Sequence, residues 1–262
     1  MSDWRYTSDE MMTVSAARML QNRQICFVGI GLPSTAANLA RLTHAPEVVL
    51  IYESGPIGAK PPVLPLSIGD GNLAETADTV VSTPEIFRYW LQGGRVDVGF
   101  LGAAQLDRFA NINTTVVGDY LKPKVRLPGA GGAPEICALA KEVLIVVKQT
   151  ERTFVEKVDF ITSAGFLSGG DARQRAGIPR RGPTAVITDL CILRPESGSN
   201  ELTVHSVHPG ISEEIIRKKS GWAIRFSDRC EETAEPTLQE LEALRDLQMR
   251  SAVAHGGAES AA

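Results

Sequence analysis

Helical and strand patterns alternate along the first part of the chain. The segment Thr7–Glu10 has the form of a capping box, in which a threonine hydroxyl and a glutamate carboxylate pair with backbone N–H groups at the start of a helix. The apolar run Ile25–Gly29 indicates a buried strand, and Glu47–Glu53 indicates a second one. Between them, Ser34–Leu42 has the pattern of a short helix with Ser34 as its N-cap. This order of elements predicts an α/β layer fold.

The same patterns continue through the rest of the chain. Further strands are expected at Val96–Leu101, Val143–Val147 and Thr184–Leu193. Pro84 opens a helix that Gly93 and Gly94 end, and a second capping box at Thr237–Glu240 opens a terminal helix. Because the sequence shows neither a repeat nor a linker, we expect one domain over residues 1–262, with a frayed tail from about residue 255 to residue 262.

The composition excludes several classes of protein. The 262 residues carry a net charge of −4 and 43% of them are hydrophobic, which fits a globular chain and argues against nucleic acid as a partner. No apolar run approaches the ~20 residues of a transmembrane helix, and the polar N-terminus resembles neither a secretory signal nor a transit peptide. The four cysteines lack any zinc-binding spacing, so we expect reduced thiols, no metal site and a cytoplasmic location.

A glutamate ends an otherwise apolar strand. Glu53 follows Val48–Tyr52 and precedes Ser54 and Gly55. In open α/β sheets, ligands bind beyond the carboxyl ends of the strands, so a carboxylate at this point is a candidate catalytic group. The alternative is a solvated acid with a turn behind it. The segment that follows, Ser54–Gly71, is rich in proline and glycine, and we expect an ordered loop that covers the site.

A glycine-rich run is the second candidate site. It spans Gly129–Ala133, and its neighbouring residues Gly131 and Gly132 leave backbone N–H groups unshielded by side chains. An oxygen atom of a ligand can then approach closely, which suits an oxyanion hole or a phosphate cradle. A plain glycine turn is the alternative. No Gly-Lys-Ser/Thr sequence follows, so the run is not a P-loop.

Gly29 and Gly31 stand between a strand and a helix, as glycines do in the first turn of a dinucleotide-binding fold. However, Ser34 occupies the position of the third glycine, and no acidic residue other than Glu53 ends the next strand. Close packing of the helix on the strand explains the two glycines equally well.

Basic residues and histidines gather at two further places. Lys122, Lys124 and Arg126 alternate just before the glycine run, so an extended segment would present all three on one face. They could bind phosphates or a carboxylate, or they could form an ordinary solvated face. His205 and His208 have no third ligand near them in the sequence, and we expect them to be turn residues rather than metal ligands.

Five segments between the first helix and about residue 195 carry a family resemblance. In chain order they are GIGLPSTAANLARLTHAP, VVLIYESGPIGAKPPVLPLSIGD, GFLGAAQLDRFANINTTVVGDYLKPKVRLPGAGGAPEI, FITSAGF and VITDLCIL. Together they resemble the beta subunits of class I coenzyme A transferases of the glutaconate CoA-transferase type. The resemblance implies an open, mostly parallel sheet with helices on both faces.

The resemblance also implies the chemistry of the site. In this family a strand-end glutamate is the covalent nucleophile, and it corresponds to Glu53. The residues expected beside the CoA thioester or its oxyanion are Gly129, Gly131, Gly132, Ala133, Gly29 and Gly31. The active site is expected to lie between this chain and a partner A subunit, with a CoA thioester as substrate and no permanently bound cofactor.

Three phrases, YESGPIGAKP, RYWLQGGRVDVGFLGAAQ and VRLPGAGGAPEI, most resemble the branch of the family that moves CoA from succinyl-CoA to 3-oxoadipate in aromatic degradation. Such a diacid needs a cation for its second carboxylate, and the candidates are Lys60, Lys122, Lys124 and Arg126. The alternatives are a subunit that acts on glutaconate or another diacid, an acyl-CoA hydrolase of the same fold, and a non-catalytic sensor.

Overall fold

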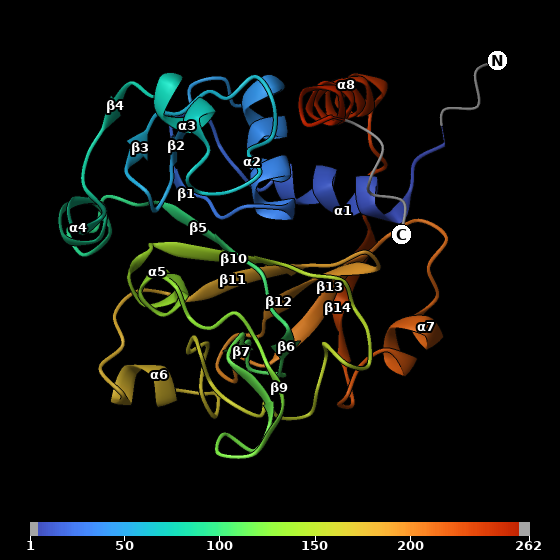
Figure 1. Cartoon of the computed structure of the whole chain (residues 1–262). Coiled ribbons are helices and arrows are strands. Elements are labelled where there is room, and N and C mark those ends of the chain that lie inside the picture. The colour runs from blue at the N-terminus through green and yellow to red at the C-terminus, as the bar shows by residue number, and fades with distance from the viewer. Residues whose placement is uncertain (1–4, 257–262) are drawn as a thin grey trace.

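The computed structural model describes residues 5–256 of the chain, and its centre is a ten-stranded sheet (Figure 1). In spatial order the strands are β14 (Arg225–Glu232), β13 (Leu202–Val207), β12 (Cys191–Pro195), β11 (Pro183–Ile187), β10 (Glu142–Val146), β5 (Val98–Leu101), β1 (Ile25–Phe27), β2 (Val49–Ile51), β3 (Pro56–Ile57) and β4 (Thr79–Val80). The central strands β2, β1, β5, β10 and β11 are parallel, whereas β12 and β3 are antiparallel to their neighbours. The mostly parallel sheet expected from the sequence is therefore confirmed.

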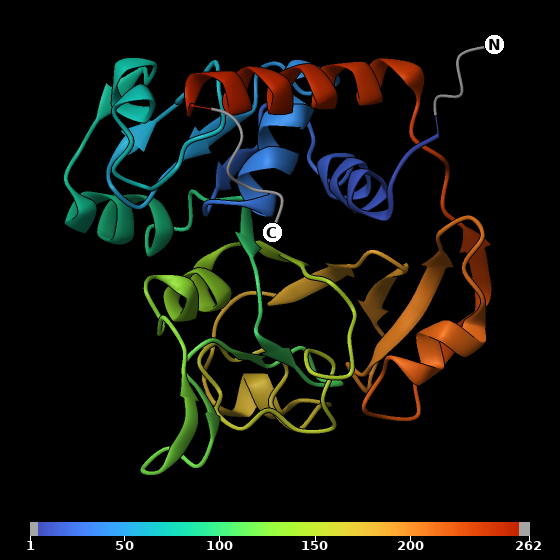
Figure 2. The ribbon, with the colours of Figure 1, turned by 45° about the vertical axis from the view of Figure 1, so that its right-hand side comes forward.

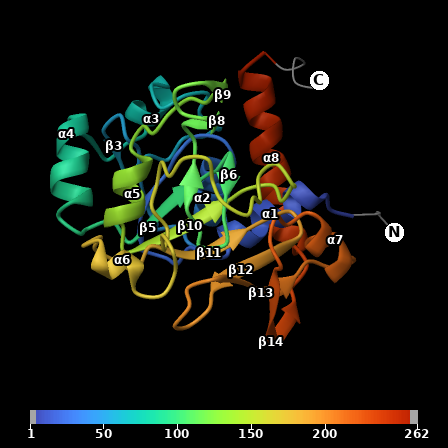
Figure 3. The same cartoon turned by 90° about the horizontal axis from the view of Figure 1, so that it is seen from below.

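Helices cover both faces of the sheet. On one face lie α1 (Ser8–Ala17), α2 (Leu32–Leu42), α3 (Gly71–Glu75) and α8 (Leu238–Ala254). The other face holds α4 (Thr83–Glu85), the π-helix η1 (Ile86–Leu91), α5 (Ala133–Leu139), α6 (Ala172–Arg175) and α7 (Glu213–Lys218). Below the sheet two small hairpins pair β6 (Gln105–Leu106) with β7 (Ile112–Asn113) and β8 (Val116–Gly118) with β9 (Pro123–Arg126). Seen from below, α5 and α6 lie on one side of the molecule and β14 forms the far edge of the sheet (Figure 3).

Alternation along the strands builds two separate cores. Cys26 and Leu50 face α1 and α2, whereas the adjacent residues Phe27 and Ile51 face η1 and α5. Successive side chains of a strand point to opposite faces, so strands buried on both faces are apolar at nearly every position. This burial explains why the apolar run Val48–Tyr52, which Glu53 follows, lacks the alternation of polar and apolar residues seen in a surface strand.

The structure corrects two expectations at the ends of elements. Ser34 is not an N-cap, because Gly31, with φ of +82°, takes that position and Ser34 is buried in the first turn of α2. Thr184–Leu193 is not one strand but an antiparallel pair, β11 and β12. Its turn forms because the Thr188 hydroxyl accepts hydrogen bonds from the N–H groups of Leu190 and Cys191.

Helix α8 lies across the helices on the α1 and α2 face of the sheet (Figure 2). It forms hydrogen bonds with the proline-rich loop that follows β2. Arg250 donates a hydrogen bond to the carbonyl of Pro62, and the Ser251 hydroxyl accepts one from the N–H of Leu64 at 2.8 Å. The ring of His255 lies 2.9 Å from the Leu64 carbonyl. The expected fraying therefore does not begin at His255, and residues 257–262 lie outside the described residues.

The capping box that opens α8 also joins it to α1. Arg18 binds both carboxylate oxygens of Glu240 at 2.7 Å, and Thr237 caps the helix. Burial alone raises the pKa of Glu240, but the hydrogen bonds from Arg18 and Thr237 outweigh it and lower the pKa to about 2. A carboxyl with a lowered pKa stabilises the fold above its unfolded-state pKa, and this contribution is lost as the pH falls toward 2.

Glu240→Gln is therefore expected to lower the free energy of unfolding by about 1–3 kcal/mol at pH 7. The difference from wild type should shrink between about pH 4.5 and pH 2, where wild-type Glu240 itself becomes protonated. Urea unfolding at several pH values measures both effects. The control is Glu242→Gln, an exposed change on the same helix. An equal loss in both variants would show that the Arg18 contact contributes nothing specific.

Candidate active site

Glu53 lies in a tight turn that follows the carboxyl end of β2. The N–H of Tyr52 bonds to the carbonyl of Pro56 at 3.1 Å, and the N–H of Gly55 returns to Tyr52 at 3.0 Å, so Glu53 and Ser54 form the outer part of the turn. Gly55 has φ of +120°, and a Cβ there would lie 2.0 Å from the carbonyl oxygen of Val81. Only glycine fits this close approach.

The turn opens into a cavity of about 200 Å³ that is lined by five of the seven residues predicted as the nucleophile or as oxyanion- and CoA-binding groups. Glu53 lines it together with Gly29, which follows β1, and with Gly131 and Gly132, which precede α5. The carboxyl ends of parallel strands meet at one edge of a sheet, which brings these distant segments together. Ala133 also lines the cavity, whereas Gly31 and Gly129 flank it outside the lining.

The glycine run is held in place from its beginning. The N–H of Gly129 donates to the carbonyl of Thr114 at 2.9 Å, and the Thr114 hydroxyl donates back to the carbonyl of Gly129 at 2.8 Å. Gly129 has φ of +106° and Gly131 has φ of +49°, so both adopt backbone conformations that favour glycine. Within residues 5–256, the N–H groups of Gly131 and Gly132 donate to no acceptor. They are therefore available to an oxyanion.

Phe87 of η1 packs against the open side of Gly132. A Cβ on Gly132 would lie 2.6 Å from Cζ of Phe87 and 3.5 Å from Oε2 of Glu53, so the ring and the carboxylate face the same side of the glycine. The ring of Phe27 lies 5.9 Å from that of Phe87 and supports it from the sheet. Among the described residues, the Glu53 carboxylate has no hydrogen bond or ion pair. It lies beside the aromatic ring of Phe87 without a counter-charge.

The proline-rich loop reaches the cavity through Ile68. The hydroxyl of Ser54 donates a hydrogen bond to the carbonyl of Ile68, and Ile68 lines the cavity together with the glycine run. Beneath the turn, Tyr52 is fully buried, with its hydroxyl 3.3 Å from that of Ser34. Burial raises the pKa of Tyr52, so its hydroxyl is neutral and serves as a rigid support.

Three contributors to the site are not evident from the sequence. The pattern around Phe87 places it only on the apolar face of a helix, and nothing near Thr114 or Ile68 distinguishes them from their neighbours. Ile68 lies within the loop expected to cover the site, so the proline-rich composition is a usable signal. The sequence signal for Thr114 and Phe87 is weak, because their roles depend on contacts between distant segments.

The predicted cations do not line the cavity. Lys60 forms an ion pair with Asp78 at 2.9 Å. Lys124 and Arg126 lie on β9 with Lys122 just before it, and the guanidinium of Arg126 lies over the ring of Tyr120. Within residues 5–256 no cluster of three His, Cys, Asp or Glu residues could hold a metal ion, and no helix is long and apolar enough to cross a membrane.

Comparison with known proteins gives a consistent family assignment. The Coenzyme A transferase family model matches residues 9–219. The chain is 70% identical over 251 residues to the B subunit of 3-oxoadipate CoA-transferase from Pseudomonas knackmussii, covering 96% of each chain. It is 32% identical to the B subunit of glutaconate CoA-transferase from Acidaminococcus fermentans, covering 92% of this chain and 93% of that one.

Solved structures share the fold. Glutaconate coenzyme A-transferase from Acidaminococcus fermentans superposes with a TM-score of 0.86 at 30% identity, covering 92% of this chain and 94% of that one. The decarboxylase AibA/AibB superposes with a TM-score of 0.81 at 26% identity, covering 94% and 96%. Since the second catalyses a different reaction, the fold does not by itself decide the chemistry. The family model and the identities nevertheless show that the chain belongs to the coenzyme A transferase family.

Proposed function

We propose that this chain is the B subunit of an enzyme that moves CoA from succinyl-CoA to 3-oxoadipate, and that Glu53 is its covalent nucleophile. The observation that carries the proposal is the unpaired Glu53 carboxylate in one cavity with Gly131 and Gly132, whose N–H groups have no acceptor among the described residues. The 70% identity to the B subunit of a 3-oxoadipate CoA-transferase supports the choice of substrates. The free cysteines, three of them buried, fit the cytoplasmic location that we also propose.

The reaction proceeds in two stages on Glu53. Its carboxylate attacks the thioester carbonyl of succinyl-CoA, the C–S bond breaks, and CoA thiolate leaves behind a glutamyl–succinyl anhydride. The thiolate then attacks the glutamyl carbonyl and releases succinate, so CoA is held on Glu53 as a thioester. With 3-oxoadipate the same steps run in reverse. Covalent catalysis divides one difficult exchange into easier steps. The anhydride formed with succinate and the one formed with 3-oxoadipate are similar in energy, because each joins the Glu53 carboxyl group to another carboxyl group.

The surroundings of Glu53 suit these steps. Each attack puts negative charge on a carbonyl oxygen, which the N–H groups of Gly131 and Gly132 can stabilise, and one such donor contributes about 3–4 kcal/mol. The apolar side chains of Phe27, Ile68 and Ile136 line the cavity and keep water from the anhydride and the thioester. Exclusion of water distinguishes a transferase from a hydrolase.

A direct assay tests the proposed substrates. The chain is co-purified with its A subunit and given succinyl-CoA with 3-oxoadipate, glutaconate or acetoacetate in turn. We expect 3-oxoadipate to have the highest kcat/KM. Preference for glutaconate would reassign the acceptor, and loss of succinyl-CoA at the same rate without any acceptor would identify a hydrolase.

The second half of the active site is expected from an A subunit, and we propose that the β8–β9 hairpin contacts it. The hairpin projects from the lower edge of the molecule and runs directly into the glycine run (Figures 1 and 2). At its tip, the side chain of Leu121 is 89% exposed. Tyr120 stacks on Phe160, and Asp159 accepts the N–H of Gly118, so the hairpin is fixed in its projecting position. Three cations accompany this apolar tip, namely Lys122, Lys124 and Arg126.

Leu121→Asp is expected to weaken assembly with the A subunit by about tenfold or more, because it replaces an apolar contact of about 1.5–3 kcal/mol with a charge. Sedimentation of the co-expressed pair measures the effect. Val253→Asp, at a side chain that is 76% exposed on α8, is the matched control. Unchanged assembly of Leu121→Asp would place the A subunit on another surface.

A further inference from the structure

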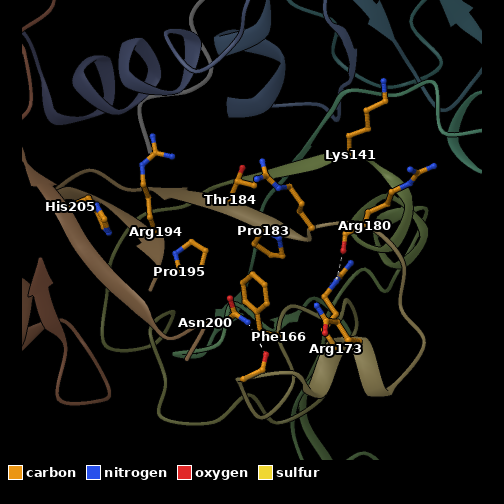
Figure 4. A pocket seen from close by; sticks show the side chains of 13 residues that line it. Lys141, Phe166, Arg173, Arg180, Pro183, Thr184, Arg194, Pro195, Asn200 and His205 are labelled. Carbon is orange, nitrogen blue, oxygen red and sulfur yellow. Dashed lines mark hydrogen bonds between the residues drawn. The ribbon is translucent and has the colours of Figure 1, made fainter. Parts of the chain in front are cut away.

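A second, larger cavity lies at the amino ends of β10 and β11, and Figure 4 shows the side chains that line it. Its volume is about 820 Å³, and its lining shares no residue with the Glu53 cavity. Lys141 comes directly before β10, and Arg181 comes shortly before β11, so this cavity lies at the amino ends of strands whose carboxyl ends point toward the catalytic edge. A ligand held here belongs to a different site from the reacting thioester.

The lining is strongly basic although the chain is acidic overall. It includes no Asp or Glu, and its basic members are Lys141, Arg173, Arg180, Arg181, Arg194 and His205. Two of the cations have a nearby carboxylate, because Lys141 pairs with Asp97 at 2.6 Å and Arg181 lies 3.5 Å from Glu142. Within residues 5–256, Arg173, Arg180 and Arg194 have no acidic partner, so the cavity has a surplus of three positive charges.

Arg173 gives the cavity a rigid wall. It is buried, and its guanidinium donates to the carbonyls of Ala164 and Cys137 at 2.7 and 2.8 Å and to that of Pro179 at 3.1 Å. These bonds fix the backbone that leads into Arg180, a residue with φ of +67°. A non-glycine residue held in this region costs energy, and such strain is concentrated at binding and catalytic sites.

The side chains of Arg194 and His205 form the opposite wall (Figure 4). They stand on the adjacent strands β12 and β13, and His205 is therefore not the turn residue expected from the sequence. Among the described residues, the guanidinium of Arg194 contacts only the sulfur of Met19, a weak acceptor, at 3.6 Å. Nε2 of His205 is shielded from solvent and has no hydrogen-bond partner in the described part of the chain.

We propose that this cavity binds a small organic anion with at least two negative charges. Guanidinium groups pair with carboxylates and phosphates through two parallel hydrogen bonds, and the surplus positive charge of the lining matches an anion of this kind. Phe166, Pro183 and Pro195 also line the cavity, and their apolar surface offers contacts for the carbon skeleton of such an anion. Phosphate esters and polycarboxylates share this chemistry.

Isothermal titration calorimetry on the chain assembled with its A subunit tests the proposal, with pyrophosphate, citrate and acetate as separate probes. We expect pyrophosphate or citrate to bind at least tenfold more tightly than acetate, and the preferred probe distinguishes a phosphate ligand from a carboxylate one. Arg194→Gln should weaken binding about ten- to hundredfold, and Arg194→Lys less, because lysine keeps the charge but not the paired geometry. The control Arg152→Gln removes an exposed charge elsewhere and should leave binding unchanged.

Several results would overturn the proposal. One is the absence of binding to the folded complex at millimolar probe concentrations, and another is an equal loss in Arg152→Gln. Tighter binding in Glu53→Gln would place the anion in the transferase site instead, because this change removes a negative charge there. If Arg194→Gln releases the A subunit in size-exclusion chromatography, the cavity receives an acidic segment of that protein rather than a small anion. Intact probe binding in an inactive Glu53→Gln complex separates this proposal from the proposed function.

Discussion

Glu53→Gln is expected to abolish CoA transfer while leaving the fold intact. An amide at this position cannot form the anhydride, and removal of a covalent nucleophile typically costs about 10⁴- to 10⁶-fold in kcat. The side chain makes no hydrogen bond or ion pair within residues 5–256, so the substitution removes no structural contact. Circular dichroism and the melting temperature should match wild type, and a succinyl-CoA:3-oxoadipate assay should show no turnover above background.

The covalent intermediate provides a second and independent measurement. Incubation of the complex with succinyl-CoA alone, followed by peptide mapping, should find CoA attached to Glu53. Glu75→Gln is the matched control, because Glu75 is an exposed carboxylate close in sequence to the same loop. Turnover that persists in Glu53→Gln, or an adduct found on Glu75 or Glu135, would remove Glu53 from the mechanism.

Gly132→Val is expected to have the next largest effect, a loss of about 10²- to 10³-fold in kcat/KM, comparable to the removal of an oxyanion donor. A Cβ at this position meets the ring of Phe87 at 2.6 Å and approaches Oε2 of Glu53 to 3.5 Å. The added side chain therefore disturbs the carboxylate and the path of the thioester oxygen together. Steady-state kinetics on the assembled enzyme measures the loss.

Two further variants identify the cause of that loss. Gly71→Val makes the same change on an exposed helix start where a Cβ meets nothing within 4 Å, and it should be nearly as active as wild type. Gly132→Ala combined with Phe87→Leu removes the clash with the ring but keeps the side chain near Glu53. Recovery of activity in this pair would assign the loss to the displaced ring, and near-normal activity of Gly132→Val would reduce the glycine run to a simple turn.

The main parts of the site were predictable because their signals are local. An apolar strand that ends in Glu53, and a run with Gly131 and Gly132, can each be recognised within a few residues. Their meeting in one cavity follows from parallel strands that share an edge. The roles of Phe87 and Thr114 were not predictable in this way, since a buried aromatic ring or a threonine gives the same sequence signal wherever it packs.

The ends of elements were harder to predict than the elements themselves. The run Thr184–Leu193 is apolar on both sides of Thr188 and Asp189, and local hydrogen bonds to the Thr188 hydroxyl turn the chain back there. Ser34 has the character of an N-cap, but Gly31 can adopt a positive φ and starts the helix earlier. In both cases local backbone geometry prevailed over a residue's general preference.

The hydrogen bonds between the end of α8 and the proline-rich loop have a consequence for the synthesis of the protein. Pro62 and Leu64 receive their anchors from Arg250, Ser251 and His255, and His255 lies 202 residues after Glu53 (255 − 53). At a translation rate of about 5–20 residues per second, the ribosome needs about 10–40 s to cover that interval. A nascent chain therefore exposes its nucleophile with the covering loop unsecured. Only a chain translated through its last helix can offer the A subunit a site whose covering loop is anchored.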